Sequence, residues 1–558
     1  MDVYDDSSDE NFYGDDHDSK DLDLLKQETL EKLKSMRETV DWEVEYERYT
    51  FFCSLRDLIF NWDCQPPDLL DIFRPEEIDY FLLESVIDTY DDKYYQGKRF
   101  IKFVARSSYK DKPNEDEDGK PSLRRTTAVH HAARREFLCV VNNLFKIYNR
   151  FDVNYTDEVG LTHFHVASMS GCEDVVEKFL KLGQDANCLG YITGDSPLHL
   201  ALTWNRERVA ELLLRNGANP NLANAKGLTS LHIMCGRDDH YDLVKMLFEI
   251  SNEKCQILQV NAQDKSGLTP LQWALRSGNK KVAELLLING ADPNMPDFEG
   301  STPLHSICKE CDDKDLVGFF FKIVDEIKQT VKIDAVDKFG RTPLQWAVAS
   351  LLPHVIHVLL DNGADLSGFV FPTSRYFGER FDSKNYRGHF KLELTSKALI
   401  IVEHLEKKGY KVDQSGALTI MTFLTKHGWF EKPLDLEKCY YDNEEFVSKA
   451  KEIVITPSLS LRDLTRLQPE EAAKLVTYSD YYKFANSSTL FKLSERHREA
   501  CTEHLCEKLS RGFFRRWALD SFLKLAPYPL PILCCEMIVE QLMNEDLRRI
   551  CLATADQS

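Results

Sequence analysis

Residues 267–294, GLTPLQWALRSGNKKVAELLLINGADPN, constrain the fold more than any other part of the chain, because they specify a complete helix–turn–helix hairpin. Thr269 suits the N-cap of a first helix, and Pro270 suits its first position, where a missing N–H costs nothing. Gly278 interrupts the helix, and Gly290 allows a second helix to end in the left-handed conformation. Such a hairpin cannot bury its apolar face alone, so it must stack against similar hairpins.

The apolar residues of this stretch recur at helical spacing, which predicts the side chains that face the core. They are Leu271, Ala274 and Leu275 in the first helix, and Val282, Leu285 and Leu286 in the second.

The position that opens the first helix recurs seven times, at spacings of 35, 34, 33, 40, 33 and 40 residues. The motifs that follow it include THFHVA, SPLHLA and TPLQWA, and the closing motif recurs as NGANPN and NGADPN. On these motifs the chain resembles the ankyrin repeat family, whose period is about 33 residues. The resemblance implies an all-α solenoid of about seven repeats over residues 121–366. The opening positions are Thr127, Thr162, Ser196, Thr229, Thr269, Thr302 and Thr342.

The repeats also follow a longer period, because Gly194, Gly267 and Gly340 are 73 residues apart. The duplicated unit is therefore a pair in which one repeat is seven residues longer and lacks the NGAD closure. Seven residues correspond to about two helical turns. We expect alternate second helices, or the loops after them, to project as ridges.

Five histidines recur at the repeat spacing, which invites a metal-binding or catalytic interpretation. Gln272 and Gln345 occupy the same position in other repeats, and glutamine cannot serve as an imidazole base. We therefore predict hydrogen-bonded caps between turns. The histidines are His130, His165, His199, His232 and His305.

The chain has 558 residues, which indicates several domains, and its formal net charge of −21 argues against general affinity for nucleic acid. Its 15 cysteines are scattered, which is typical of an intracellular protein with reduced thiols, cytoplasmic or nuclear. No apolar run reaches the roughly 20 residues that cross a bilayer, so no membrane association is expected.

Different compositions flank the repeats. Residues 1–20 are acidic and predict a disordered tail, and residues 21–120 predict a helical cap followed by an exposed loop. Residues 367–454 predict a connector, largely non-helical up to about residue 392 and then containing two helices of a decayed repeat. The apolar face of the cap helix that begins at Pro75 is formed by Ile78, Phe81, Leu82 and Val86.

Residues 455–558 predict a separate helical module, with one helix near 494–510 and another over 513–525. Its last segment has an LP…DL register that resembles an F-box, the helical module that docks on the Skp-type linker of cullin–RING ubiquitin ligases. The register departs from that pattern at Leu533, where F-boxes usually carry Glu. The positions that carry the resemblance are Leu530, Pro531, Ile538, Leu542, Asp546 and Leu547.

Ankyrin repeats followed by SLSLRDLTRLQPEEAAKL and LCEKLSRGFFRRWALD resemble the PRANC family, named for the C-terminus of poxviral ankyrin proteins. That family is F-box-like, so the resemblance implies a Skp-type linker as a partner. Ankyrin proteins bind a protein target through hairpin tips and inner helices, and ordinary solvated loop residues are the alternative at each position. By position, the candidates are Trp204, Arg237, Lys265, Arg276, Phe298, Lys338, Phe339 and Arg341.

No phosphate-binding, dinucleotide-binding or hydrolase motif occurs, so neither an enzyme nor a cofactor is predicted. His497, Cys501 and His504 share a helical face, but packing explains them better than a zinc site does. Two functions remain open. One is an adaptor that brings a captured protein to a ubiquitin ligase, and the other is a sequestering inhibitor or scaffold of a Rel/NF-κB-type factor.

Overall fold

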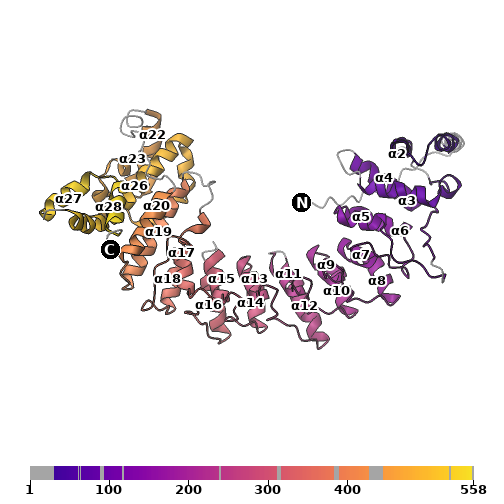
Figure 1. Ribbon diagram of the computed structural model, residues 1–558, viewed down its shortest axis with the longest axis horizontal. Helices are drawn as coiled ribbons and strands as arrows, with labels where there is room; N and C mark the ends of the chain where they lie inside the picture. The colour runs from indigo at the N-terminus through magenta and orange to yellow at the C-terminus, as the bar shows by residue number, and fades with distance from the viewer. Residues whose placement is uncertain are drawn as a thin grey trace. The chain divides into compact units, whose positions relative to one another are not determined.

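The computed structural model describes residues 30–60, 62, 65–87, 93–115, 119–237, 240–310, 316–381, 389–426, 444–526 and 530–555. The chain divides into two compact units, of which the first contains residues 1–234 and 242–259 and the second contains residues 235–241 and 260–558. Both units are almost entirely helical, as the sequence predicts (Figure 1). The predicted acidic tail lies outside the described residues. No described helix is both long and apolar enough to cross a bilayer.

The first unit begins with the helical cap and continues into paired helices (Figure 1). The first helix of each pair packs against the first helix of the next, from α5 to α7 to α9. The cap contains α2 (Glu45–Phe60), η1 (Leu69–Asp71), α3 (Pro75–Ile87) and α4 (Lys93–Arg106). The pairs are α5 (Ala128–Arg134) with α6 (Val141–Ile147), α7 (His163–Ser170) with α8 (Glu173–Lys181), and α9 (Pro197–Thr203) with α10 (Glu207–Arg215). The pair α11 (Ser230–Cys235) and α12 (Tyr241–Glu253) lies where the two units divide.

The second unit repeats the same arrangement, with α13 against α15 and α15 against α17. Its pairs are α13 (Pro270–Arg276) with α14 (Lys280–Ile288), α15 (Pro303–Glu310) with α16 (Leu316–Glu326), and α17 (Pro343–Ala349) with α18 (Pro353–Asp361). A short 3-10 turn, η4 (Glu379–Phe381), and two longer helices, α19 (His389–Lys407) and α20 (Gln414–Lys426), follow. The helix α19 therefore begins at His389, so residues 389–392, which the sequence predicts to be non-helical, belong to a helix.

The C-terminal part of the second unit packs around one 31-residue helix, α26 (Glu495–Leu525). The sequence predicts two helices here. The structure shows one, because Gly512 costs a helix interior only about 1 kcal/mol and the neighbouring Phe513 and Phe514 are buried. The surrounding elements are α22 (Glu444–Glu452), β1 (Val454–Thr456), β2 (Leu459–Ser460), α23 (Leu461–Arg466), α24 (Pro469–Leu475), α25 (Tyr478–Ala485), η5 (Ser488–Lys492), α27 (Ile532–Gln541) and α28 (Asn544–Ala555).

The recurring histidines are caps, as predicted. At the start of α9, the Ser196 N–H donates to His199 Nδ1 at 3.1 Å, and the His199 N–H donates to Ser196 Oγ at 3.3 Å. Because Nδ1 accepts, Nε2 carries the hydrogen that it shares with Leu228 O in the next repeat, at 3.0 Å. Gln272 makes the same bridge to Ser301 O at 2.6 Å. These two caps therefore also tie their repeats to the following ones.

The predicted core residues of the first helix, Leu271, Ala274 and Leu275, are all fully buried. In the second helix Val282 and Leu286 are buried, but Leu285 is only half-buried. Leu287 takes its place, because α14 packs against α13 on one side and α16 on another, which shifts the buried face by part of a turn.

The closing turns explain the two repeat lengths. Gly217, Gly290 and Gly363 have φ near +93°, and in the longer repeats Cys255 and Lys328 take the left-handed position with φ of 53° and 57°. The second helices α12 and α16 of these longer repeats have 13 and 11 residues, whereas α10, α14 and α18 have nine. The alternate second helices are thus the longer ones, and their projection as ridges stays a prediction.

Acid should destabilise the repeats through these buried histidines. Burial lowers the pKa of His130 and His165 to about 4, from an ordinary value of 6.5. The folded state therefore binds these protons less readily than the unfolded state does. The stability they contribute is complete above pH 6.5 and is lost as the pH falls toward 4.

The substitution His165→Gln keeps the bridge, as Gln272 shows, and removes the titration. Urea unfolding measures the free energy of unfolding at each pH. From pH 7.5 to pH 4.5, we expect this free energy to fall by about 2 to 3 kcal/mol less in the variant than in wild type. An equal decline in both proteins would contradict this assignment.

Candidate protein-binding surfaces

The helix α27 presents an apolar face to solvent. Pro531 precedes its first turn, and Cys535 and Val539 form its buried side. On its outer side Leu533 is 69% exposed and Met537 is 67% exposed. Isolated apolar residues are common on surfaces, but several exposed apolar residues on one short segment make it a candidate interaction site. The exposed face, here called the α27 face, consists of Leu530, Ile532, Leu533, Met537, Ile538 and Met543.

A buried polar network fixes α27 on α26. Arg511 Nη2 donates to Glu540 O at 2.8 Å, which satisfies a carbonyl at the C-terminal end of α27. Asn544, which is fully buried, donates from Nδ2 to Ser510 Oγ at 2.9 Å and to Glu507 O at 3.1 Å. The network holds the short helix in one orientation, so the apolar face remains outside.

The predicted F-box-like residues differ in their exposure to solvent. Leu530, Pro531 and Ile538 are exposed, and Leu542 is half-buried. Asp546 Oδ2 accepts a hydrogen bond from the Met543 N–H at 3.3 Å.

Leu547 is fully buried on α28, which packs against α26. Its side chain supports the core and does not belong to the surface offered to a partner, so its predicted docking role is corrected.

The network includes the carboxyl group of Glu507, whose burial makes ionisation less favourable than in water. Glu507 Oε1 accepts from the Asn544 N–H at 2.9 Å, whereas Glu507 Oε2 is buried without a hydrogen-bond partner among the described residues. Burial raises the pKa of Glu507 to about 7. The stability that this group contributes is present below pH 4.5 and is lost as the pH rises through 7.

We expect Glu507→Gln to stabilise the protein by about 1 to 3 kcal/mol at pH 8 and to have little effect at pH 4.5. Glutamine keeps the acceptor for Asn544 but carries no charge. Chemical denaturation at the two pH values measures the difference, and a destabilised variant at pH 8 would show that the charge is needed for Arg511.

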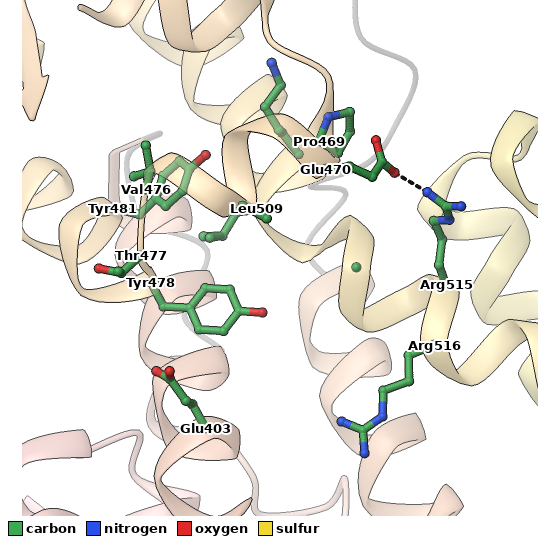
Figure 2. A pocket seen from close by; sticks show the side chains of 13 residues that line it. Glu403, Pro469, Glu470, Val476, Thr477, Tyr478, Tyr481, Leu509, Arg515 and Arg516 are labelled. Atoms are coloured by element: carbon green, nitrogen blue, oxygen red, sulfur yellow. Dashed lines mark hydrogen bonds and ion pairs between the residues drawn. The ribbon is translucent and has the colours of Figure 1, made fainter. Parts of the chain in front are cut away.

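A cavity of about 580 Å³ lies beside α24, α25 and α26 in the second unit (Figure 2). Its cations are already engaged. Lys508 Nζ donates to three backbone carbonyls, those of Leu464, Thr465 and Leu467, at 2.6 to 2.9 Å. Arg515 pairs with Glu470, and with Glu540 of α27 at 2.7 Å. These pairs brace α24 and α27 against α26.

The predicted residues of the repeat surface lie in both units. In the first unit Trp204 is half-buried at the C-cap of α9. In the second unit Arg237, Lys265 and Arg276 are exposed. The remaining four, Phe298, Lys338, Phe339 and Arg341, come from two loops that the structure brings together, because the Lys338 N–H donates to Glu299 O at 2.8 Å.

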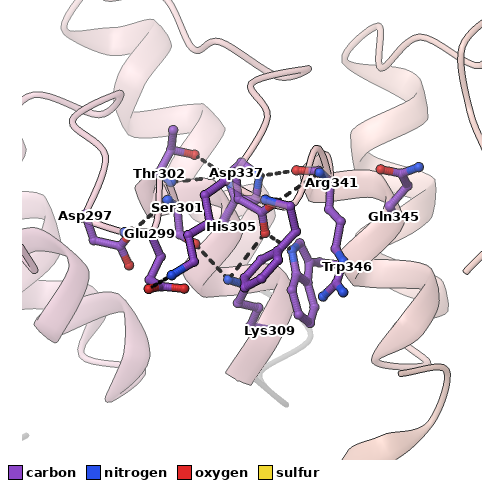
Figure 3. A network of polar contacts seen from close by, with 12 residues as sticks. Asp297, Glu299, Ser301, Thr302, His305, Lys309, Asp337, Arg341, Gln345 and Trp346 are labelled. Atoms are coloured by element: carbon purple, nitrogen blue, oxygen red, sulfur yellow. Dashed lines mark hydrogen bonds and ion pairs between the residues drawn. The ribbon is translucent and has the colours of Figure 1, made fainter. Parts of the chain in front are cut away.

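Two buried carboxylates that the sequence analysis did not single out shape these loops. Asp337 Oδ1 accepts from the N–H groups of Phe339 and Arg341 at 2.9 and 3.0 Å, and Oδ2 accepts from Trp346 Nε1 at 2.8 Å (Figure 3). Asp264 and Trp273 make the same contact at 3.0 Å. The Asp–Trp pair recurs 73 residues apart, so the 73-residue period of the sequence could have identified it.

Tyr191 is another candidate interface residue that the sequence did not indicate. It lies in a loop of the first unit, is 86% exposed, and packs over Gly160, where an added Cβ would come within 2.4 Å of the tyrosine Cβ. Exposed aromatic residues suit protein interfaces, so this loop extends the candidate surface of the first unit.

No group of three or more potential metal ligands occurs within the described ranges. Cys501 is buried, and His504 Nε2 lies 3.1 Å from Thr465 O. Burial lowers the pKa of His504 to about 4. Packing and a backbone hydrogen bond thus account for these residues.

Stacked pairs of short helices with exposed loops define a helical-repeat protein of the kind that binds other proteins. Residues 129–224, 198–297 and 287–368 match the family model described as ankyrin repeats, in three copies. The chain therefore contains ankyrin repeats.

Three of the curated relatives that align with part of the chain illustrate the similarity. The putative ankyrin repeat protein FPV031 of fowlpox virus is 29% identical over 170 residues, covering 30% of this chain and 49% of the relative. The p105 subunit of nuclear factor NF-kappa-B from Gallus gallus is 31% identical over 176 residues, covering 30% and 17%. Palmitoyltransferase AKR1 of Lachancea kluyveri is 29% identical over 152 residues, covering 27% and 20%. Each alignment spans less than half of the relative's length.

Proposed function

We propose that this protein is an adaptor. Its ankyrin repeats capture a target protein, and its C-terminal helices recruit that target to a cullin–RING ubiquitin ligase by binding the Skp-type linker. The observation that carries the proposal is the α27 face, an apolar surface at the segment where the sequence resembles an F-box. In this scheme the chain performs no chemistry, because the transfer of ubiquitin belongs to the ligase.

The arrangement of α27 supports a docking role. Interface cores are rich in apolar side chains and methionine, and Leu533, Met537 and Ile538 offer both on consecutive turns. Leu533 stands where F-boxes usually carry Glu, so the proposed contact is more apolar there. The network of Arg511 and Asn544 holds the helix in place before binding, which reduces the entropy lost on association.

Co-precipitation with a purified Skp-type linker tests the proposal. The full chain should retain the linker, and a variant with Pro531→Ala and Leu542→Ala should not. Ile288→Ala is a suitable control, because Ile288 is an exposed apolar residue on α14, in the repeats. Equal recovery by all three proteins would exclude α27 as the docking site.

The second candidate is a sequestering inhibitor or scaffold of a Rel/NF-κB-type factor, with no ligase role. The similarity of the repeats to part of the p105 subunit of NF-kappa-B favours it. Both functions use the repeats, but only the adaptor uses α27. The test is a variant in which the α27 face is made polar. If this variant still inhibits the target fully and the abundance of the target does not change, the result favours sequestration.

A further inference from the structure

Aromatic rings and cations gather on neighbouring loops of the second unit. We call this the tip surface and define it as Phe298, Lys338, Phe339, Arg341 and Tyr376. Backbone hydrogen bonds join the loops, from the Phe298 N–H to Ser266 O at 3.3 Å and from the Lys338 N–H to Glu299 O at 2.8 Å. These hydrogen bonds therefore connect the loops of three successive repeats, two of which carry residues of the tip surface.

Arg341 lies among three aromatic rings. Its guanidinium carbon is 4.0 Å from the ring centre of Tyr376, 4.8 Å from that of Trp346 and 4.9 Å from that of Phe339. Among the described residues, no carboxylate is within ion-pair distance of this guanidinium. Stacking fixes the plane of the group while its N–H groups remain available, which is the arrangement that binds a carboxylate with two hydrogen bonds.

Apolar surface lies beside this cation. Phe298 is 67% exposed and Phe339 is 57% exposed. Phe298 is held in place by its close approach to Gly267, where an added Cβ would lie 2.4 Å from the Phe298 nitrogen. The loop therefore presents the ring outward at a defined position, and the two rings can cover an apolar side chain of a partner.

The local charge is opposite to that of the whole protein. Lys265 and Arg375 are exposed in the adjoining loops, and neither pairs with a carboxylate of the described chain. The loop carboxylates Asp264, Asp297 and Asp337 accept backbone N–H groups. The exposed carboxylate of Glu299 is paired with Lys338. Among the described residues of these loops, the charges that remain unpaired are thus cationic, namely the exposed Lys265 and Arg375 and the half-buried Arg341, within a chain of formal net charge −21.

We propose that the tip surface binds an acidic segment of the captured protein, in which a large apolar residue is flanked by Asp or Glu. A carboxylate pairs with Arg341, and the apolar side chain packs against Phe298 and Phe339. Charge complementarity selects such a segment over basic or neutral ones. The inference rests on the proposed capture of a target protein and specifies the chemistry that the target must offer.

Selection from a displayed library of random 12-residue peptides on the full chain tests the inference. The enriched peptides should carry an apolar residue with at least two acidic neighbours. Fluorescence anisotropy with one labelled enriched peptide should then show affinity reduced at least about tenfold by Arg341→Gln or Phe339→Ala. Arg341→Lys, which keeps the charge but loses the planar stack, should fall between wild type and Arg341→Gln.

Two matched controls should bind the peptide as wild type does. Arg208→Gln removes an exposed arginine from α10, and Ile288→Ala removes an exposed apolar side chain from α14. Thermal unfolding confirms that every variant is folded. Enrichment of neutral or basic peptides, no enrichment, or affinity unchanged in Arg341→Gln would overturn the inference.

A labelled 12-nucleotide polyuridine RNA separates a protein ligand from a nucleic acid. Binding of this RNA that depends on Arg341 would overturn the inference in favour of a nucleic-acid surface. Retention of the Skp-type linker is measured on the same variants. If the peptide result fails while the linker is still bound through α27, only the tip-surface inference fails and the adaptor role stands.

Discussion

A variant with Met537→Asp and Ile538→Asp is expected to bind the Skp-type linker at least about 100-fold more weakly than wild type, because two carboxylates would be buried in an apolar contact. Both side chains are substantially exposed on α27, so the melting temperature should change by less than about 2 °C. Isothermal titration calorimetry gives the affinity, and circular dichroism gives the melting temperature.

The matched control for this variant is Ile288→Asp, which places a carboxylate at an exposed apolar position in the repeats. It should bind the linker as wild type does. Undiminished affinity in the α27 variant, or an equal loss in the control, would contradict the assignment of the docking face.

The largest effect on stability is expected from Arg125→Leu, at about 3 to 5 kcal/mol of unfolding free energy. Arg125 pairs with Asp79 of α3 and, at 2.8 Å, with Asp111. Tyr155 of the second repeat donates to the same Asp111 at 2.8 Å. Removal of the arginine leaves two carboxylates without their cation at the point where the helical cap joins the first repeats, and urea unfolding measures the cost.

Two further variants separate charge burial from lost packing. Arg125→Leu combined with Asp111→Asn should recover part of the stability, because one buried charge is removed. Arg150→Leu breaks an exposed ion pair with Asp152 and should cost far less stability than Arg125→Leu, because solvent screens exposed pairs. If Arg125→Leu cost no more than Arg150→Leu, the cap would not depend on this cluster.

The repeats were predictable because their signals are local. A capping box joins residues three positions apart, so the offset between Ser196 and His199 was enough to place a helix start. The left-handed turns also depend mainly on one residue, and Gly290 adopts the expected conformation with φ of 92°. Such features repeat with the sequence, so copies reinforce the prediction.

The buried faces of single helices were harder to predict. An apolar pattern such as VAELLLI allows two adjacent faces, and contact between α14 and α16 selects the one that buries Leu287 and leaves Leu285 half-buried. Likewise, Leu547 belongs to the core because α28 packs on α26. Contacts between segments far apart in sequence decide these cases.

In the candidate sites, too, the sequence indicated individual residues but not the contacts between distant segments. The sequence identified Phe339 and Arg341 by their place in the repeat. It did not predict that Arg341 would stack on Tyr376, because that tyrosine follows the last recognisable repeat. It also located the α27 segment, but which of its faces is exposed depends on the anchoring of Asn544 and Arg511 to α26.

Hydrogen–deuterium exchange of the full chain, with and without a saturating Skp-type linker, tests the central claim most directly. The account predicts that protection on binding is concentrated in residues 530–543, which contain the α27 face. Protection confined to other residues, or no change in exchange at saturating linker, would contradict it.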